Sequence, residues 1–143
     1  MDTKEKAAKK MLADIRKTVK RLKIKLTSME FVRIKSPRHA PQCCALGAAL
    51  ALKAKTKNEL KKLLGTNWHE GDHVAYCADR PALVAKILNG ATTEEDMLQL
   101  ESGFENWHLY DWIADNRGIE TDENHPFYKI GAALRKDADK AKR

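Results

Sequence analysis

Uncharged residues fill one stretch in the middle of the chain, Cys43-Cys44-Ala45-Leu46-Gly47-Ala48-Ala49-Leu50-Ala51-Leu52. This run is too short for a membrane-spanning helix, which needs about 20 apolar residues. Its Ala and Leu content is typical of a helix, and we expect one from Gln42 to Lys53. Gly47 within it costs roughly 1 kcal/mol relative to Ala, which indicates the close approach of another helix. The stretch therefore predicts a buried central helix onto which the neighbouring segments fold.

Amphipathic helices are predicted on either side of the central helix. Between Lys4 and Lys25, apolar residues recur at the spacing of a single helix face: Ala8, Met11, Leu12, Ile15, Val19 and Leu22. Further helices are expected at 56–64, 82–88, 93–104, 107–114 and from 126 onward. We therefore expect a mainly α fold in which about five or six helices surround the central one. Residues 1–143 are interpreted as a single compact domain with a fraying basic N-terminus and a charged C-terminal tail.

Two helix starts carry capping signals. Thr3 or Asp2 is placed to cap the first helix. Thr92 and Glu95 have the spacing of a capping box, and the acidic residues that follow Thr93 favour the positive end of a helix dipole.

A short β element is the least defined part of the prediction. Residues 29–34 are strand-like in composition, because Phe31 and Val32 are adjacent and Ile34 shares a face with Val32. A strand needs a partner, and residues 23–26 are the only nearby candidate. A short β-hairpin between these two segments therefore stays open.

Charge is distributed unevenly along the chain. The net charge of the protein is +7, with +9 in residues 1–40, +3 in 41–90, −9 in 91–125 and +4 in 126–143. A uniformly basic protein would indicate nucleic acid as a partner. This bipolar pattern is also consistent with two oppositely charged parts that neutralise each other in the fold.

The N-terminal residues and the cysteines indicate where the protein resides. Residues 1–10 are polar and charged, without the apolar segment of a signal peptide. Three cysteines, two of them adjacent, do not suggest a disulfide framework. We expect a cytoplasmic protein of the producing or host cell, with no membrane association and with reduced, buried thiols.

The hexapeptide Trp68-His69-Glu70-Gly71-Asp72-His73 contains the pattern H-E-x-x-H. On a helix, His69 and His73 would share a face and bind zinc, with Glu70 as the general base of a hydrolase. Gly71 and Asp72 are poor helix formers, which argues against a zinc-protease helix. A structural metal bound by His69, His73 and Cys77, with Cys43, Cys44 or His39 as a distant fourth ligand, is a second alternative. The simplest interpretation is a polar loop, so no metal and no cofactor are expected.

No other catalytic motif stands out in the sequence. It contains no nucleophile elbow, no P-loop and no dinucleotide-binding glycine pattern. Cys43 and Cys44 have apolar neighbours, which indicates small core residues rather than reactive thiols. We therefore expect no catalytic residues and favour a protein that is not an enzyme.

Two surfaces are candidates for binding a macromolecule. Aromatic residues interleaved with acids suggest a protein-docking surface, because aromatic side chains make good anchors and charges form the rim. Its candidate residues are Trp107, Tyr110, Trp112, Glu101 and Glu105. Cations on the first helix suggest an alternative surface that follows nucleic-acid phosphates. These are Lys9, Lys10, Arg16, Lys17, Lys20 and Arg21.

Two stretches resemble known sequences of small phage and prophage proteins. Cys43-Cys44-Ala45-Leu46-Gly47-Ala48 resembles their CCLG or CALGAL helix start. Residues 100–107 and 126–135 are similar to their LExGFExW and PFYxLGxxLR segments. The resemblance implies a viral or mobile-element origin and nothing about catalysis. The function expected is that of a phage-type accessory protein that binds a host macromolecule, in particular a host protein; nucleic-acid binding and zinc-dependent hydrolysis through residues 69–73 are the alternatives.

Overall fold

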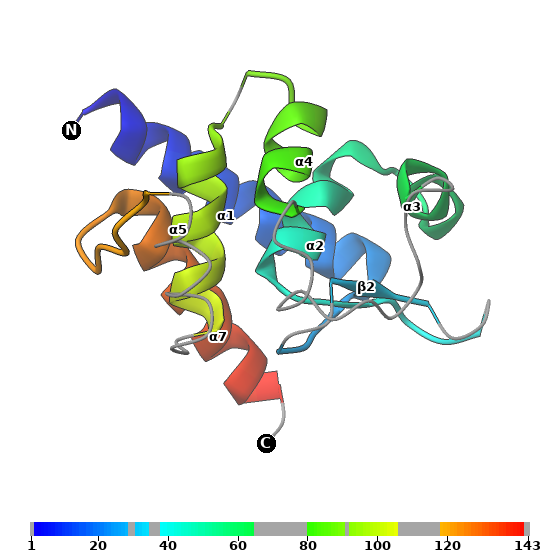
Figure 1. Ribbon diagram of the computed structural model, residues 1–143. Coiled ribbons are helices and arrows are strands. Elements are labelled where there is room, and N and C mark those ends of the chain that lie inside the picture. The colour runs from blue at the N-terminus through cyan, green and yellow to red at the C-terminus, as the bar shows by residue number, and fades with distance from the viewer. Residues whose placement is uncertain are drawn as a thin grey trace.

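Helices dominate the architecture. The computed structural model describes residues 2–28, 31–34, 38–64, 80–90, 92–105 and 118–141. Within them, the helices are α1 (Thr3–Leu22), α2 (Ala45–Leu50), α3 (Lys57–Leu64), α4 (Arg80–Ile87), α5 (Glu94–Glu105) and α7 (Pro126–Ala141). A 3₁₀ turn, η1 (Ala51–Lys53), continues α2 (Figure 1). The prediction of a mainly α fold is confirmed.

The first helix, α1, is amphipathic as its sequence predicts, but it ends at Leu22, three residues before the predicted end at Lys25. The Asp2 side chain caps it by accepting a hydrogen bond of 2.7 Å from the Glu5 N–H. Its C-cap residue is Lys23, which adopts a left-handed conformation with φ of 57°. The buried face includes Ala8, Met11 and Ile15. None of the helices in the described ranges combines the length and hydrophobicity that a membrane crossing requires.

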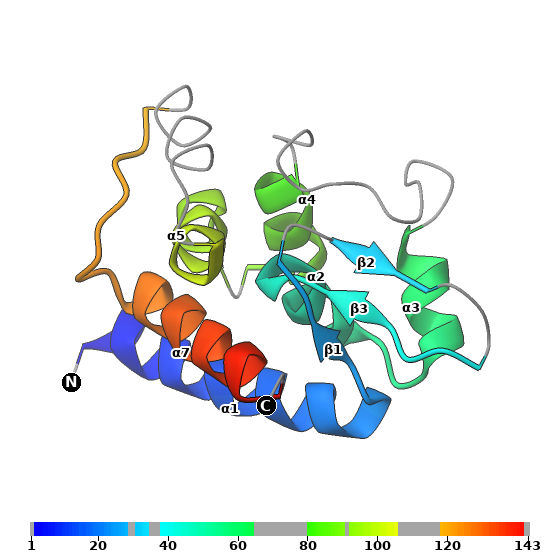
Figure 2. The same cartoon turned by 90° about the horizontal axis from the view of Figure 1, so that it is seen from below.

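A three-stranded sheet replaces the β-hairpin considered from the sequence. Its strands are β1 (Lys25–Leu26), β2 (Val32–Arg33) and β3 (Gln42–Cys43), in the order β1-β3-β2. The central strand β3 runs parallel to β1 and antiparallel to β2. The predicted pairing of the first two strands is therefore wrong, because β3 lies between them (Figure 2).

The apolar run is buried as predicted, but its helix is shorter than predicted. Residues 42–43 are strand, and α2 begins only at Ala45. Every residue of α2 is buried, and the helix contacts α1, α4, α5 and β3. A Cβ atom at Gly47 would collide with the backbone carbonyl of Phe31. The predicted close approach at Gly47 is thus real, but the segment beside it is the β2 region and not another helix.

The helices α5 and α7 touch through their backbones. A Cβ atom at Gly103 would overlap the Tyr128 carbonyl, and one at Gly131 would overlap the Leu100 carbonyl. The helix α7 also lies along α1, where the Arg16 guanidinium binds the Asp137 carboxylate at 2.8 Å and 3.2 Å (Figure 2). Helix α7 therefore joins the first helix of the chain to α5.

Candidate functional site

The cations that the sequence assigns to nucleic-acid binding are all exposed on α1. Three of them are already engaged within the protein. Lys10 pairs with Asp14 at 2.8 Å, Arg16 pairs with Asp137, and Arg21 donates to the Ala54 carbonyl at 2.8 Å. The other three, Lys9, Lys17 and Lys20, form no ion pair within the described part of the chain. All six predicted cations are therefore accessible, but Lys10, Arg16 and Arg21 already have a bonding partner within the protein.

The outward side of α1 presents a row of lysines, which we call the lysine face: Lys6, Lys9, Lys17 and Lys20. Intervals of three, eight and three residues keep these side chains on one side of a helix with 3.6 residues per turn. Their opposites on the helix, Ala8, Met11 and Ile15, are buried. Lys6 was not among the cations predicted from the sequence, although it lies within the predicted helix. It belongs to an ordered helix that starts at Thr3.

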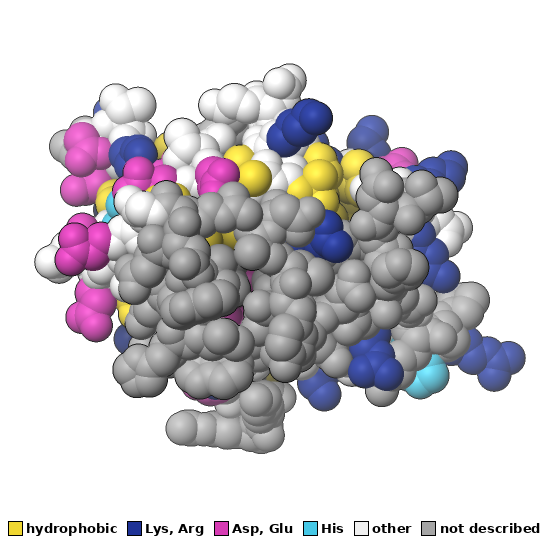
Figure 3. All heavy atoms as spheres, viewed as in Figure 1, with side chains coloured by type: hydrophobic (Ala, Val, Ile, Leu, Met, Phe, Trp, Pro, Cys, Tyr) yellow, Lys and Arg dark blue, Asp and Glu magenta, His cyan; other side chains and the backbone are white. Residues whose placement is uncertain are grey.

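Charge also separates over the visible surface of the molecule. Acidic side chains gather at the end that carries the N-terminus and the segment between α5 and α7, whereas Lys and Arg gather around α3 and the sheet (Figure 3). The exposed acids at the first end include Glu120, Asp122 and Glu123. Exposed cations around the second end include Lys55, Lys61 and Lys62. On this face of the molecule, acidic and basic side chains therefore lie toward opposite ends (Figure 3).

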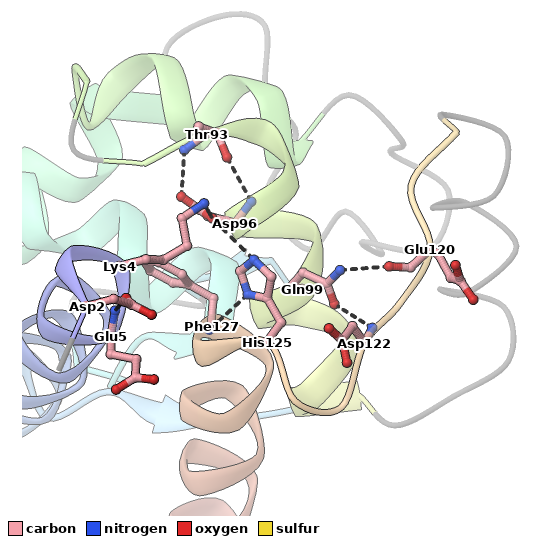
Figure 4. Close-up of polar contacts among 10 residues, drawn as sticks. All are labelled: Asp2, Lys4, Glu5, Thr93, Asp96, Gln99, Glu120, Asp122, His125 and Phe127. Atoms are coloured by element: carbon pink, nitrogen blue, oxygen red, sulfur yellow. Dashed lines mark hydrogen bonds and ion pairs between the residues drawn. The ribbon is translucent and has the colours of Figure 1, made fainter.

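One acidic side chain, Asp96, connects three segments (Figure 4). Its Oδ1 lies 3.0 Å from Lys4 Nζ of α1 and 3.6 Å from Nε2 of His125, just before α7. The other ring nitrogen of His125 accepts the Phe127 N–H at 3.1 Å. Because the Asp96 side chain is only 5% exposed, these contacts serve to hold α1, α5 and α7 together.

The same aspartate belongs to the capping box of α5. The Thr93 N–H donates to Asp96 Oδ2, and the Asp96 N–H donates to Thr93 Oγ1, both at 3.1 Å (Figure 4). The box predicted at Thr92 and Glu95 is therefore wrong by one residue. Thr92 is instead buried, and its hydroxyl has no hydrogen-bond partner among the described residues.

Gln99 holds the segment between residue 118 and α7 against α5 through two hydrogen bonds. Its amide nitrogen donates to the Glu120 carbonyl at 2.9 Å, and its amide oxygen accepts the Asp122 N–H at 3.0 Å (Figure 4). Gln99 is 1% exposed, so both bonds are made in the interior. This contact positions the acidic loop against α5 and has a structural role.

Glu101 and Glu105 do not form an exposed rim. The exposed fraction is 0% for Glu101 and 5% for Glu105, so their predicted place on a docking surface is wrong. Both face Cys44, which precedes α2 and is itself 0% exposed. The Cys44 sulfur and one oxygen from each carboxyl group lie within 4.8 Å of one another. We call these three residues the buried acid cluster. Ser28 adds a hydrogen bond from its hydroxyl to Glu105 Oε1.

Burial controls protonation in this cluster. Desolvation, and then the charge of Glu105, raise the pKa of Glu101 well above its ordinary value. Desolvation, and then the charges of Glu101 and Glu105, raise the pKa of the Cys44 thiol. A buried thiol that holds its proton is a poor nucleophile. The expected burial of Cys43 and Cys44 is confirmed, and this chemistry disfavours catalysis by Cys44.

Other candidate residues lie outside the described ranges. They are the metal candidates His69, His73 and Cys77, and the aromatic candidates Trp107, Tyr110 and Trp112. Their assignments remain predictions. Comparisons of the chain with protein-family models, with curated proteins and with solved structures find no match.

Proposed function

We propose that this protein is a non-enzymatic binding protein whose target is nucleic acid, contacted through the lysine face of α1. The observation that carries the proposal is that Lys6, Lys9, Lys17 and Lys20 lie together on this exposed face. The resemblance to phage and prophage proteins supports a role as an accessory factor that acts on a host macromolecule.

The dimensions of the lysine face suit a phosphate backbone. Lys6 and Lys20 are separated by about 21 Å along the helix, at a rise of 1.5 Å per residue. Duplex DNA carries one negative charge per roughly 1.7 Å of its axis, so a row of this length can follow several phosphates. Because contacts from lysine to phosphate do not distinguish the bases, the binding should be largely independent of the nucleotide sequence.

An amphipathic cationic helix also suits a membrane surface, but α1 lacks a free apolar side. A helix that lies in a membrane interface must insert its apolar face among the lipids. Ala8, Met11 and Ile15 of α1 are instead buried in the core. The lysine face is therefore better suited to contacts with phosphate groups at a hydrophilic surface.

Two features distinguish this proposal from binding to a host protein. Glu101 and Glu105 are unavailable as rim charges because they are buried. The lysine face, in contrast, is exposed along α1. Docking of a host protein through Trp107, Tyr110 and Trp112 remains the alternative.

Titration with short duplex and single-stranded DNA at several salt concentrations tests the proposal. Affinity should fall steeply with salt, because each phosphate contact contributes about 0.9 to the slope of log K against log salt. Replacing Lys9, Lys17 and Lys20 by Ala should lower the slope by about 3 on duplex DNA. Arg21 is left unchanged because it bonds to Ala54.

Three exposed lysines elsewhere supply a control with the same change in net charge: Lys61, Lys62 and Lys86, each replaced by Ala. This control should keep most of the affinity. Equal losses in the two variants would show that only net charge matters and would overturn the role of α1. A protein that copurifies equally with and without nuclease treatment, and no binding of DNA, would favour the host-protein alternative.

A further inference from the structure

The buried acid cluster unites side chains from two distant parts of the chain. Cys44 lies between β3 and α2, and its side chain makes no capping bond to α2. Glu101 and Glu105 are four residues apart on α5, so they project from the same side of that helix. All three are buried, and the Cys44 sulfur and one oxygen from each carboxyl group lie within 4.8 Å of one another. Fold topology, rather than local sequence, brings them together.

Glu101 is the residue that the fold leaves unexplained. Its side chain is fully buried, yet neither carboxyl oxygen has a hydrogen-bond partner of ordinary geometry within the described residues. Cys44, Glu105 and the Leu46 N–H lie close enough to influence its pKa without meeting that geometry. An unpaired buried carboxyl group lowers the stability of the fold even when it is neutral. An apolar residue of similar size would avoid this loss of stability. A carboxyl group at this position is therefore best explained by a ligand that binds it.

We propose that Cys44, Glu101 and Glu105 bind one divalent transition-metal ion, with zinc as the fitting member of the class. One thiolate and two carboxylates are established zinc ligands, and the sulfur disfavours magnesium and calcium, which take oxygen ligands. Tetrahedral zinc would keep one position for a fourth ligand. The Ser28 hydroxyl orients Glu105 as outer groups commonly orient metal ligands.

Metal binding would give the buried acidic groups of the cluster a positively charged partner. The ion would displace the protons of Cys44 and Glu101, so binding releases protons and strengthens as pH rises. The ion then supplies the missing partner of Glu101. Because the ligands come from α5 and from the start of α2, the ion would stabilise the packing of these two helices. These three ligands are different residues from the His69, His73 and Cys77 set predicted from the sequence.

Cobalt(II) substitution tests the site directly. The full chain is unfolded in denaturant with a chelator, and the chelator is then removed. The protein is refolded under reducing conditions with or without cobalt(II) and examined by absorption spectroscopy. Loading during refolding avoids slow entry into a buried site. We expect one equivalent of cobalt and a thiolate-to-cobalt charge-transfer band in the near ultraviolet. Zinc should displace cobalt and raise the melting temperature, because the ion binds only the folded form.

The adjacent cysteine provides a matched control. Cys44→Ser should abolish the charge-transfer band, whereas Cys43→Ser, which alters an equally buried neighbour outside the cluster, should retain it. Glu101→Gln keeps the shape of the protonated side chain and should therefore fold. Its affinity for cobalt should fall by more than about tenfold.

Several results would overturn the proposal. They are the absence of the band in the parent protein, a band that survives Cys44→Ser, and a band that Cys77→Ala removes while Cys44→Ser does not. If Cys44→Ser fails to fold, as judged by circular dichroism, the Glu101→Gln variant decides. Undiminished metal affinity in Glu101→Gln would then refute the site.

Discussion

Glu101 illustrates how the environment of one residue changes the chemistry inferred from its type. In the sequence it lies in a segment of high negative charge, where an exposed carboxylate is the ordinary expectation. In the fold it is 0% exposed and lies next to Glu105 and Cys44. Desolvation therefore raises its pKa, and the nearby Glu105 raises it further.

This raised pKa predicts a dependence of stability on pH. Above the ordinary pKa of 4.5, an unfolded chain releases the Glu101 proton while the folded protein keeps it. The free energy of unfolding should therefore fall as pH rises from that value through the raised folded pKa. Glu101→Gln removes the titrating group, so its stability should decline less over this range. Urea unfolding of both proteins at a series of pH values, with a chelator present, measures the difference. Parallel curves would contradict the assigned shift.

At the scale of elements, α5 departs most from a simple amphipathic pattern. Its residues from Asp96 to Glu105 are all buried, although Gln99, Glu101 and Ser102 are polar. A helix buried on every side is usually apolar on every side. The helix α5 is buried although it is partly polar. Gly103 packs against α7 on one side, and the polar groups of Asp96 and Gln99 form hydrogen bonds on others.

At the α5–α7 contact, helix propensity and packing have opposite effects on stability when glycine is replaced by alanine. Helix propensity alone favours Ala over Gly by about 1 kcal/mol, so Gly103→Ala would stabilise an isolated helix. Packing opposes this, because a Cβ atom there would overlap the Tyr128 carbonyl. We expect Gly103→Ala and Gly131→Ala each to destabilise the protein by roughly 1–3 kcal/mol, as overpacking does. Chemical denaturation measures the change; a stabilised variant would show that the backbones do not touch.

The N-terminus of α5 permits a test between adjacent threonines. Thr93→Ala removes a capping hydroxyl and should cost about 1 kcal/mol of stability. Thr92→Val replaces a buried hydroxyl that has no partner in the described part of the protein, so it should be neutral or stabilising. Thermal unfolding compares the two variants. A larger loss for Thr92→Val would restore the capping box predicted at Thr92 and Glu95.

At the scale of the whole molecule, α2 is the element around which the others pack. It contacts α1, α4, α5 and the sheet, and all its residues are buried. Its short length is sufficient because Ala and Gly let these neighbours approach closely. The surface carries exposed charge of both signs, with the lysine face on α1 and exposed acids at Glu120, Asp122 and Glu123.

This arrangement predicts that a charge in α2 unfolds the whole protein. Leu46→Asp places an unpaired carboxylate at a position that is 0% exposed, which should prevent folding or cause aggregation. Leu52→Asp, in the half-buried turn η1, is the matched control and should lose less stability. Circular dichroism and gel filtration report the outcome. If Leu46→Asp melted like the parent, α2 would not be the centre of the core.

Local patterns in the sequence were sufficient for the helices that their own residues specify. The spacing of Ala8, Met11 and Ile15 predicts the buried side of α1, and Asp2 caps it as expected. Residues 56–64 contain a helix, and Pro126 begins the last one, as predicted. Periodicity, capping and proline position act over a few residues, so the sequence alone determined these elements and the mainly α class.

Tertiary contacts decided the rest. The strand β3 at 42–43 separates β1 from β2, and Cys44 meets Glu101 across 57 residues of chain. Neither pairing has a periodic signal, because each depends on segments far apart in sequence. The burial of Glu101 and Glu105 likewise results from packing around α5, which overrides the preference of carboxylates for water. The sequence therefore determined which segments are helical, whereas long-range packing determined which polar groups meet in the interior.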